Sequence, residues 1–244
     1  EKAGIYRAGR PAICADPAPP ASLLDHARRI GADLRCVARD FSAQREGGQW
    51  TYRGQAIVWP ALPLPAMAGA FQLRNAAAAL AALEAVRARL PVSEAAIRQG
   101  LAQASVAGRF QRIARAPDVI LDVAHNPEAA RALAATLREQ PVAGRTLAVV
   151  GMLADKDAGG VFAALRGEID AWWTCTPDSP RAQDAAALAA LLRAHAGRAP
   201  VSVQPDVNTA LAEAQSAAHE GDRILVFGSF HTVAAVLDHA ATQQ

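Results

Sequence analysis

Lysine is nearly missing from this chain. Of the 25 basic residues among 244, only Lys2 and Lys156 are lysines, and every other positive charge is an arginine. A guanidinium stays charged and presents a planar fork, whereas an amine can lose its proton and act as a nucleophile. Two lysines kept in an arginine-biased chain indicate chemistry that arginine does not supply, although biased codon usage with two chance survivors explains the same count.

Long apolar runs, a signal segment and paired cysteines are also missing. No apolar run reaches the roughly 18 to 20 residues that a membrane span needs, and no charged-then-apolar segment opens the chain. Cys14, Cys36 and Cys175 are odd in number and lack a C-x-x-C pair, so they indicate neither a disulfide framework nor a zinc site. We expect them to be buried small hydrophobes in a cytoplasmic protein without a membrane partner.

A basic block is likewise absent. The formal net charge is +2, and the arginines are scattered singly or in pairs, so nucleic acid is not an expected partner. No G-x-G-x-x-G follows a strand-like segment, which argues against a nicotinamide-binding domain. The chain begins with Glu1 instead of Met, and its first residues read as the middle of a motif. We therefore expect it to be a fragment of a longer protein.

A chain of this length is expected to form two domains, which we place at residues 1–107 and 108–244. In the first, apolar periodicity and turn residues predict a strand at 11–15, a helix at 21–30 ended by Gly31, a strand at 34–37 and a hairpin over 49–59. Three prolines predict an extended loop at 60–65. A helix is expected at 72–90, and a second follows Pro91 with Ser93 as its N-cap.

From about Gly108 the pattern becomes a regular alternation of strands and helices. Strands are predicted at 110–114, 119–123, 146–150, 171–175, 201–203 and 223–227. Helices are predicted at 127–139, 159–166, 184–196, 208–219 and 231–240. This pattern predicts an α/β fold with a mostly parallel six-stranded sheet covered on both faces. Ligands of such sheets bind beyond the carboxyl ends of the strands.

Three of these strand ends carry polar residues, in the segments 121–128, 150–157 and 227–233. In the first, Pro127 opens a helix whose free N–H groups suit a phosphate or a ribose, with Asp122 as an acceptor and His125 as a donor. The alternative is that Asn126 only caps this helix and that His125 is a surface residue. Because three clusters share one edge of one sheet, we favour a ligand site.

Six segments resemble, in order and spacing, the motifs of bacterial dihydrofolate synthase/folylpolyglutamate synthase in the Mur ligase superfamily. They are Glu1-Lys2-Ala3-Gly4-Ile5, Phe71-Gln72-Leu73-Arg74-Asn75-Ala76-Ala77, Gly108-Arg109-Phe110-Gln111, Asp122-Val123-Ala124-His125-Asn126-Pro127, Gly151-Met152-Leu153-Ala154-Asp155-Lys156-Asp157 and Gly228-Ser229-Phe230-His231-Thr232-Val233. The resemblance implies that 1–107 is the remainder of a central ATP-binding domain and that 108–244 is a Rossmann-like glutamate-ligase domain. The family's amino-terminal P-loop has no match in this sequence.

The reaction that the resemblance implies is ATP-dependent amide formation between glutamate and dihydropteroate, and then between glutamate and tetrahydrofolate or its glutamylated forms. The γ-phosphate of ATP activates the substrate carboxyl as an acyl phosphate, which the glutamate amine attacks. Catalysis rests on Mg²⁺, on cations and on alignment of the reactants. Lacking the P-loop half, the chain alone is expected to be inactive, and the enzyme is expected to be a monomer.

The resemblance also implies a role for individual residues. Lys2 matches a carbamylated lysine that serves as a metal ligand, and Asn75 matches a contact to adenine. Arg109 matches a phosphate contact, Asp122 a ribose contact, and His125 a contact in the phosphate or ribose region with a catalytic role. Lys156 and Ser229 match residues that hold the incoming glutamate, and Asp155 and His231 are assigned to the same glutamate or substrate site. The alternatives are surface ion pairs for Lys2 and Arg109, a helix cap for Asn75, and loop ordering for Asp155, Asp157 and His231.

Other interpretations stay open at this point. A relative of the same superfamily that acts on muramyl peptides has a similar pattern, and a nucleotide-binding module without catalysis is a second alternative. Four aromatic residues resemble a platform for a pterin ring, but aromatic side chains beside a strand usually belong to the core, and we interpret them as structural. They are Phe162, Trp172, Trp173 and Phe230.

Overall fold

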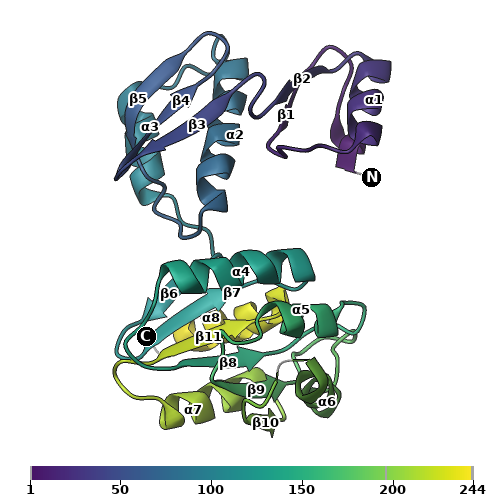
Figure 1. Ribbon diagram of the computed structural model, residues 1–244, viewed down its shortest axis with the longest axis vertical. Helices are drawn as coiled ribbons and strands as arrows, with labels where there is room; N and C mark the ends of the chain where they lie inside the picture. The colour runs from purple at the N-terminus through teal and green to yellow at the C-terminus, as the bar shows by residue number, and fades with distance from the viewer. Residues whose placement is uncertain (1, 196, 243–244) are drawn as a thin grey trace. The chain divides into compact units, whose positions relative to one another are not determined.

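The computed structural model describes residues 2–195 and 197–242, and contacts divide them into two compact units (Figure 1). The amino-terminal unit comprises the residues up to Ala66 together with Ala70–Ala104. The carboxyl-terminal unit comprises Met67–Gly69 and the residues from Ser105 on. This division reflects only which residues pack together. The assignment of 1–107 and 108–244 to two functional domains stays a prediction.

The amino-terminal unit begins with a short 3-10 helix, η1 (Lys2–Ile5), and a β–α–β segment. Strands β1 (Pro11–Cys14) and β2 (Asp33–Cys36) are parallel, and α1 (Ala21–Ile30) connects them. Gly31 ends α1 with φ +69°, and its N–H donates to the carbonyls of Ala27 and Arg28. A residue without Cβ adopts this left-handed conformation at little cost, so the predicted end of the helix is confirmed.

The same unit continues with an antiparallel sheet of order β3-β4-β5 and two helices. The strands are β3 (Ser42–Glu46), β4 (Gln49–Arg53) and β5 (Val58–Pro63); the helices are α2 (Phe71–Val86) and α3 (Glu94–Gln103). Trp50, Tyr52 and Leu62 are fully buried against apolar residues of both helices. The Ser93 hydroxyl accepts from the Ala96 N–H, as predicted for the N-cap of α3.

Two predictions in this unit are wrong. Pro60 and Pro63 lie in β5, not in a loop. Strand β5 is an edge strand, and proline is tolerated there because only one side of the strand takes part in the ladder. Helix α2 ends at Val86, whereas the prediction extended to Leu90. The residue before Pro91 is disfavoured in helical geometry, and a turn with bonds from the Arg89 and Leu90 N–H groups to the Val86 carbonyl replaces the last helical residues.

The carboxyl-terminal unit is an α/β sandwich around a sheet of order β10-β9-β8-β11-β7-β6. Its strands are β6 (Gln111–Ala114), β7 (Asp118–Asp122), β8 (Thr146–Val150), β9 (Ala171–Cys175), β10 (Val201–Gln204) and β11 (Arg223–Phe227). Only β6 is antiparallel to its neighbour. The helices are α4 (Pro127–Glu139), α5 (Ala158–Ala164), α6 (Ala185–His195), α7 (Val207–Ala217) and α8 (Phe230–Thr242). The predicted fold class is confirmed; the predicted end of α6 at Ala196 lies outside the described residues.

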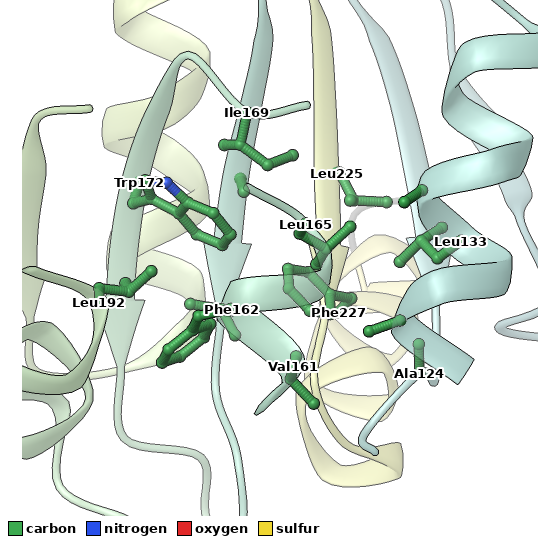
Figure 2. Close-up of a cluster of buried hydrophobic side chains, with 14 of the residues drawn as sticks. Ala124, Leu133, Val161, Phe162, Leu165, Ile169, Trp172, Leu192, Leu225 and Phe227 are labelled. Atoms are coloured by element: carbon green, nitrogen blue, oxygen red, sulfur yellow. The ribbon is translucent and has the colours of Figure 1, made fainter. Parts of the chain in front are cut away.

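Helices cover both faces of this sheet, because each central strand is apolar on both sides. On one face, Trp172, Leu225 and Phe227 pack with side chains of α4, α5 and α6, and Figure 2 shows Phe162 beside Trp172 in this core. On the other face, the alternate residues of the same strands, such as Val149, Trp173 and Val226, pack with α7 and α8. Phe162, Trp172 and Trp173 are buried, so their interpretation as core residues is confirmed.

The order of the strands brings the three predicted clusters of polar residues to neighbouring positions at one edge of the sheet. Strand β11 lies between β7 and β8 and is parallel to both, so the segments that follow these three strands leave the same edge of the sheet side by side. Beyond β8 the chain steps outward to β9 and β10 before it returns to β11. Within the described residues, no helix is both long and apolar enough to cross a membrane.

Candidate functional site

A pocket of about 170 Å³ opens at the carboxyl edge of the six-stranded sheet. Its walls come from the segments that follow β7, β8, β9 and β11. The lining residues are His125, Leu153, Lys156, Arg181, Gly228, Ser229, Phe230 and His231. Four basic side chains thus surround a small cavity that lies within one unit. Such a cavity suits an anionic ligand.

Two glycines allow the segments after β8 and β11 to approach closely. Gly228 has φ +113°, and a Cβ added there would lie 2.6 Å from the Gly151 carbonyl oxygen. A Cβ on Gly151 would in turn lie 2.8 Å from Thr232 Oγ1. The Gly151 N–H donates to the Phe227 carbonyl, which continues the contact between the strands past their ends. Steric overlap alone therefore explains why Gly151 and Gly228 are glycines, independently of any ligand.

The cations of the pocket share one carboxylate. Lys156 Nζ lies 2.9 Å from Asp155 Oδ2, and Arg181 Nη1 lies 3.7 Å from Asp155 Oδ1. The hydrogen bond from Lys156 is the main cause that lowers the pKa of Asp155, with Arg181 adding to it. Asp157 caps α5 by accepting from the Gly160 N–H, so of the two aspartates that flank Lys156 only Asp155 faces the cations.

Ser229 lines the pocket, but its side chain is buried and already bonded. The hydroxyl accepts from the Thr232 N–H and lies 2.8 Å from Thr232 Oγ1, which donates to the Gly151 carbonyl. This network caps the start of α8 and attaches it to the segment after β8. His231, in the first turn of α8, is exposed and faces the cavity. The structure thus shows a structural role for Ser229 beside its position in the pocket wall.

His125 has a defined orientation. Its Nδ1 lies 2.7 Å from the Val123 carbonyl oxygen, and because a carbonyl only accepts, Nδ1 must carry the proton. The other nitrogen, Nε2, is left to accept from a ligand when the ring is neutral or to donate when it is charged. The ring also contacts Phe230, with centroids 6.2 Å apart. Asn126 caps α4 by accepting from the Ala129 N–H, as the alternative interpretation predicts, and His125 is half-buried; its ligand contact stays a prediction.

Asp122 is used by the backbone around it. Its carboxylate accepts from the N–H groups of Phe110 and Ala124, at 2.9 and 2.8 Å. Burial is the largest influence on this carboxyl and raises its pKa, although the two backbone bonds and Arg109 act in the other direction. The bond to Phe110 holds the segment that precedes β6 against the end of β7. That segment presents the exposed Arg109 side chain.

Lys2 and Asn75 belong to the amino-terminal unit. Lys2 is exposed in η1, and its predicted neighbour Glu1 lies outside the described residues. Asn75 is exposed on α2, where its amide donates to the Gln72 side chain and does not cap the helix. In the described part of the chain, no group of three or more His, Cys, Asp or Glu side chains is arranged to hold a metal ion. The expectation of a metal at Lys2 stays a prediction.

Four residues of the pocket were not predicted as functional: Leu153, Arg181, Gly228 and Phe230. Arg181 follows β9, in the segment Thr176 to Gln183, whose prolines and small polar residues are typical of an ordinary loop. The signal in the sequence that could have identified Arg181 is its position after a fourth strand, at the same edge of the sheet as the other clusters. Phe230 was interpreted as a core residue; this is wrong, since it is 61% exposed at the pocket. It lies two residues before Thr232, the first buried position of α8.

Comparison with known proteins decides the family. Residues 108–230, half of the chain, match the family model described as Mur ligase, glutamate ligase domain. The chain belongs to the Mur ligase family. Its matched region contains every residue that lines the pocket except His231, which follows it directly. The resemblance that the motifs carry is thereby confirmed.

Several relatives of this Mur ligase chain are described as dihydrofolate synthase/folylpolyglutamate synthase. The dihydrofolate synthase/folylpolyglutamate synthase of Escherichia coli strain K12 is 40% identical over 98% of the chain and 54% of the relative. E. coli FolC in complex with DHPP and ADP has a TM-score of 0.89 and 38% identity, over 100% of this chain and 56% of that chain. A bifunctional folylpolyglutamate synthase/dihydrofolate synthase with Mn, AMPPNP and L-glutamate bound has a TM-score of 0.87 and 39% identity, over 98% and 55%. The chain spans about half the length of these proteins.

Proposed function

We propose that this chain is part of an ATP-dependent ligase that joins L-glutamate to dihydropteroate and to tetrahydrofolate or its glutamylated forms through an acyl phosphate. The observation that carries the proposal is the pocket of four basic side chains at the carboxyl edge of a glutamate-ligase domain. The similarity to enzymes of this description over nearly the whole chain supports it. The proposed partner is a P-loop half of the same enzyme, because the relatives are about twice as long.

The pocket suits the carboxylates of glutamate. Lys156 and Arg181 supply two cations that share a single carboxylate of the protein, so positive charge remains for a ligand. His231 and Phe230 complete the wall. An amino acid held there by its carboxylates directs its amine toward the reacting carbonyl, and this alignment lowers the barrier by converting the attack into an intramolecular step.

Nucleotide contacts are proposed for the segments beside the pocket. Arg109 offers a planar fork for phosphate oxygens, at a position held by the Asp122 carboxylate. The oxygens of Asp122 each keep a lone pair for a ribose hydroxyl after accepting their backbone bonds. His125 Nε2 donates to phosphate oxygens when the ring is charged, and Asn75 is proposed for the adenine edge. These assignments rest on the resemblance together with the free hydrogen-bonding capacity of each group.

ATP would be bound with Mg²⁺, which neutralises phosphate charge when present. Apart from Lys2, the metal ligands are proposed to come from the phosphates and from outside this chain, because the described residues hold no group of three or more His, Cys, Asp or Glu side chains arranged for a metal ion. Lys2, exposed in η1, keeps its proposed role as a carbamate ligand. A cytoplasmic location also stays a proposal; three buried free thiols fit a reducing compartment.

The decisive experiment uses a complete enzyme, made by joining the chain to the P-loop half of the E. coli relative. We expect it to release ADP only when L-glutamate and dihydropteroate are both present, with the intact E. coli relative as the positive control. The 244-residue chain alone should release none, because no P-loop is present to hold the phosphates. ADP release that ignores glutamate, or ligation by the chain alone, contradicts the proposal.

A muramyl-peptide ligase is the second candidate, since the family model covers enzymes that share this domain. Replacing dihydropteroate by a UDP-muramyl substrate in the same assay separates the two. A non-catalytic nucleotide-binding module is the third candidate, and glutamate-dependent ADP release excludes it.

A further inference from the structure

The feature that leads beyond the proposed function is the pair of loops that carry Lys156 and Arg181. The segment after β8 and the segment after β9 run antiparallel for a short distance, with a bridge between Leu153 and Ala182. The Ala154 N–H donates to the Arg181 carbonyl, and the Gln183 N–H donates to the Met152 carbonyl. The backbones of the two cation-bearing residues are therefore fixed relative to each other.

The side chains, in contrast, need a separate constraint. Lysine and arginine are long and lose much rotamer freedom when they are held in one geometry. The Arg181 side chain is 64% exposed and that of Lys156 is 31% exposed, so packing alone leaves both of them free to move. Asp155 supplies the constraint. One of its oxygens contacts Lys156 at 2.9 Å and the other faces Arg181 at 3.7 Å.

Asp155 performs this role from outside the cavity. Lys156 and Arg181 line the pocket, whereas Asp155 does not. Its carboxylate faces one nitrogen of each cation, so other N–H groups of Lys156 and Arg181 remain for a ligand in the cavity that these two residues line. The lowered pKa of Asp155 keeps this carboxylate charged throughout the neutral range.

We propose that Asp155 is a positioning residue that joins Lys156 and Arg181 into one two-cation receptor for a carboxylate of the amino-acid substrate. This inference rests on the proposed function and names the receptor of its second substrate. It gives Asp155 a role through its two ion pairs, without a contact of its own to the substrate. It further implies that the two cations act as a unit, so that losing Asp155 weakens the contribution of both.

The kinetic test uses the complete enzyme described above. Asp155→Asn should raise the KM for L-glutamate about fivefold, the upper range for a partly exposed ion pair, with kcat within twofold and the KM for ATP unchanged. Asp155→Glu should restore part of the loss. In the double variant with Arg181→Gln, the KM should rise less than the product of the two single effects, because the residues share one interaction. An unchanged KM in Asp155→Asn, or equal changes for ATP and glutamate, overturns the inference.

Asp178→Asn is the matched control. Asp178 is an exposed aspartate in the same loop as Arg181, so its replacement removes the same charge from the same edge of the sheet. It lines a different cavity and forms no ion pair with either cation in the described structure. A KM for glutamate that rises equally in both variants points to general electrostatics, and this outcome also overturns the inference.

A second measurement is independent of catalysis. Only two lysines occur in the chain, so ¹³C-lysine labelling gives two Cε signals, which Lys2→Arg assigns. L-glutamate added to the 244-residue chain should shift the Lys156 signal and not that of Lys2, with a midpoint about fivefold higher in Asp155→Asn. No shift at Lys156, or an unchanged midpoint, contradicts the receptor. A complete enzyme without glutamate-dependent ADP release, combined with the expected shifts, refutes the proposed function and leaves the receptor intact.

Discussion

At the scale of single residues, Asp222 shows how one carboxylate organises the edge opposite the pocket. It precedes β11, and its oxygens accept from the N–H groups of Arg145 and His219 and from the Arg145 guanidinium. Its carbonyl accepts from the Asp118 N–H. The starts of β7, β8 and β11 are therefore joined at one residue, whose side chain is only 4% exposed.

This arrangement predicts a specific pH dependence of stability. Burial alone would raise the pKa of Asp222, but the bonds from Arg145 and His219 outweigh it and lower the pKa from 3.8 to about 2. A lowered folded-state pKa means that the stabilisation is complete above the unfolded value and is lost as the pH falls through about 2. Asp222→Asn should therefore cost about 2 kcal/mol of unfolding free energy at pH 7 and progressively less below pH 4.

Urea unfolding followed by tryptophan fluorescence between pH 2 and 7 measures this difference. Asp178→Asn, which removes an exposed carboxylate, should change the unfolding free energy by less than about 0.5 kcal/mol at every pH. A difference between wild type and Asp222→Asn that stays constant from pH 7 to pH 2 is incompatible with the proposed cause.

At the scale of elements, the approach of the segments after β8 and β11 depends on Gly228. Gly228→Ala places a methyl group 2.6 Å from the Gly151 carbonyl oxygen in addition to an unfavourable φ of +113°. Gly167→Ala is the matched control, since Gly167 has φ +86° in the same unit but open space around it. Gly167→Ala should cost about 1 kcal/mol from backbone strain. Gly228→Ala should cost an additional 1–3 kcal/mol, roughly, from steric overlap.

Thermal or urea unfolding of both variants compares these costs. Because the overlap in Gly228→Ala separates the two segments that form the pocket, the Lys156 response to L-glutamate should weaken in this variant and stay normal in Gly167→Ala. Equal costs in the two variants, with equal glutamate responses, argue against the steric account.

Some helices and strands follow from the local sequence pattern, and others form only because of their tertiary contacts. The buried strands β8, β9 and β11 were predicted with their observed bounds, because they are apolar on both faces and flanked by turn residues. Strand β3 was missed, since Ser42–Glu46 is mostly polar and exposed and becomes a strand by pairing with β4. Pro63 was taken for a loop because only the sheet order shows that β5 is an edge.

At the scale of the molecule, each unit has its own core. The two apolar clusters of the six-stranded sheet contain only residues from Phe110 on, and the cluster around Trp50 contains only residues up to Leu101. Residues 105–244 expressed alone should therefore fold cooperatively. A single sigmoidal urea transition with coincident circular dichroism and fluorescence midpoints is the expected result. Non-coincident midpoints or a molten state contradict it.

The sequence alone determined the α/β class, the helix ends marked by Gly31 and Ser93, and the presence of polar residues after β7, β8 and β11, because these depend on local periodicity, caps and the alternation of strands with helices. Only the tertiary structure decided which of those residues meet. Lys156 and His231 share one cavity because β11 inserts between β7 and β8, and Arg181 joins them because the segment after β9 pairs with the one after β8. Both are pairings between distant segments, whose order no local pattern specifies.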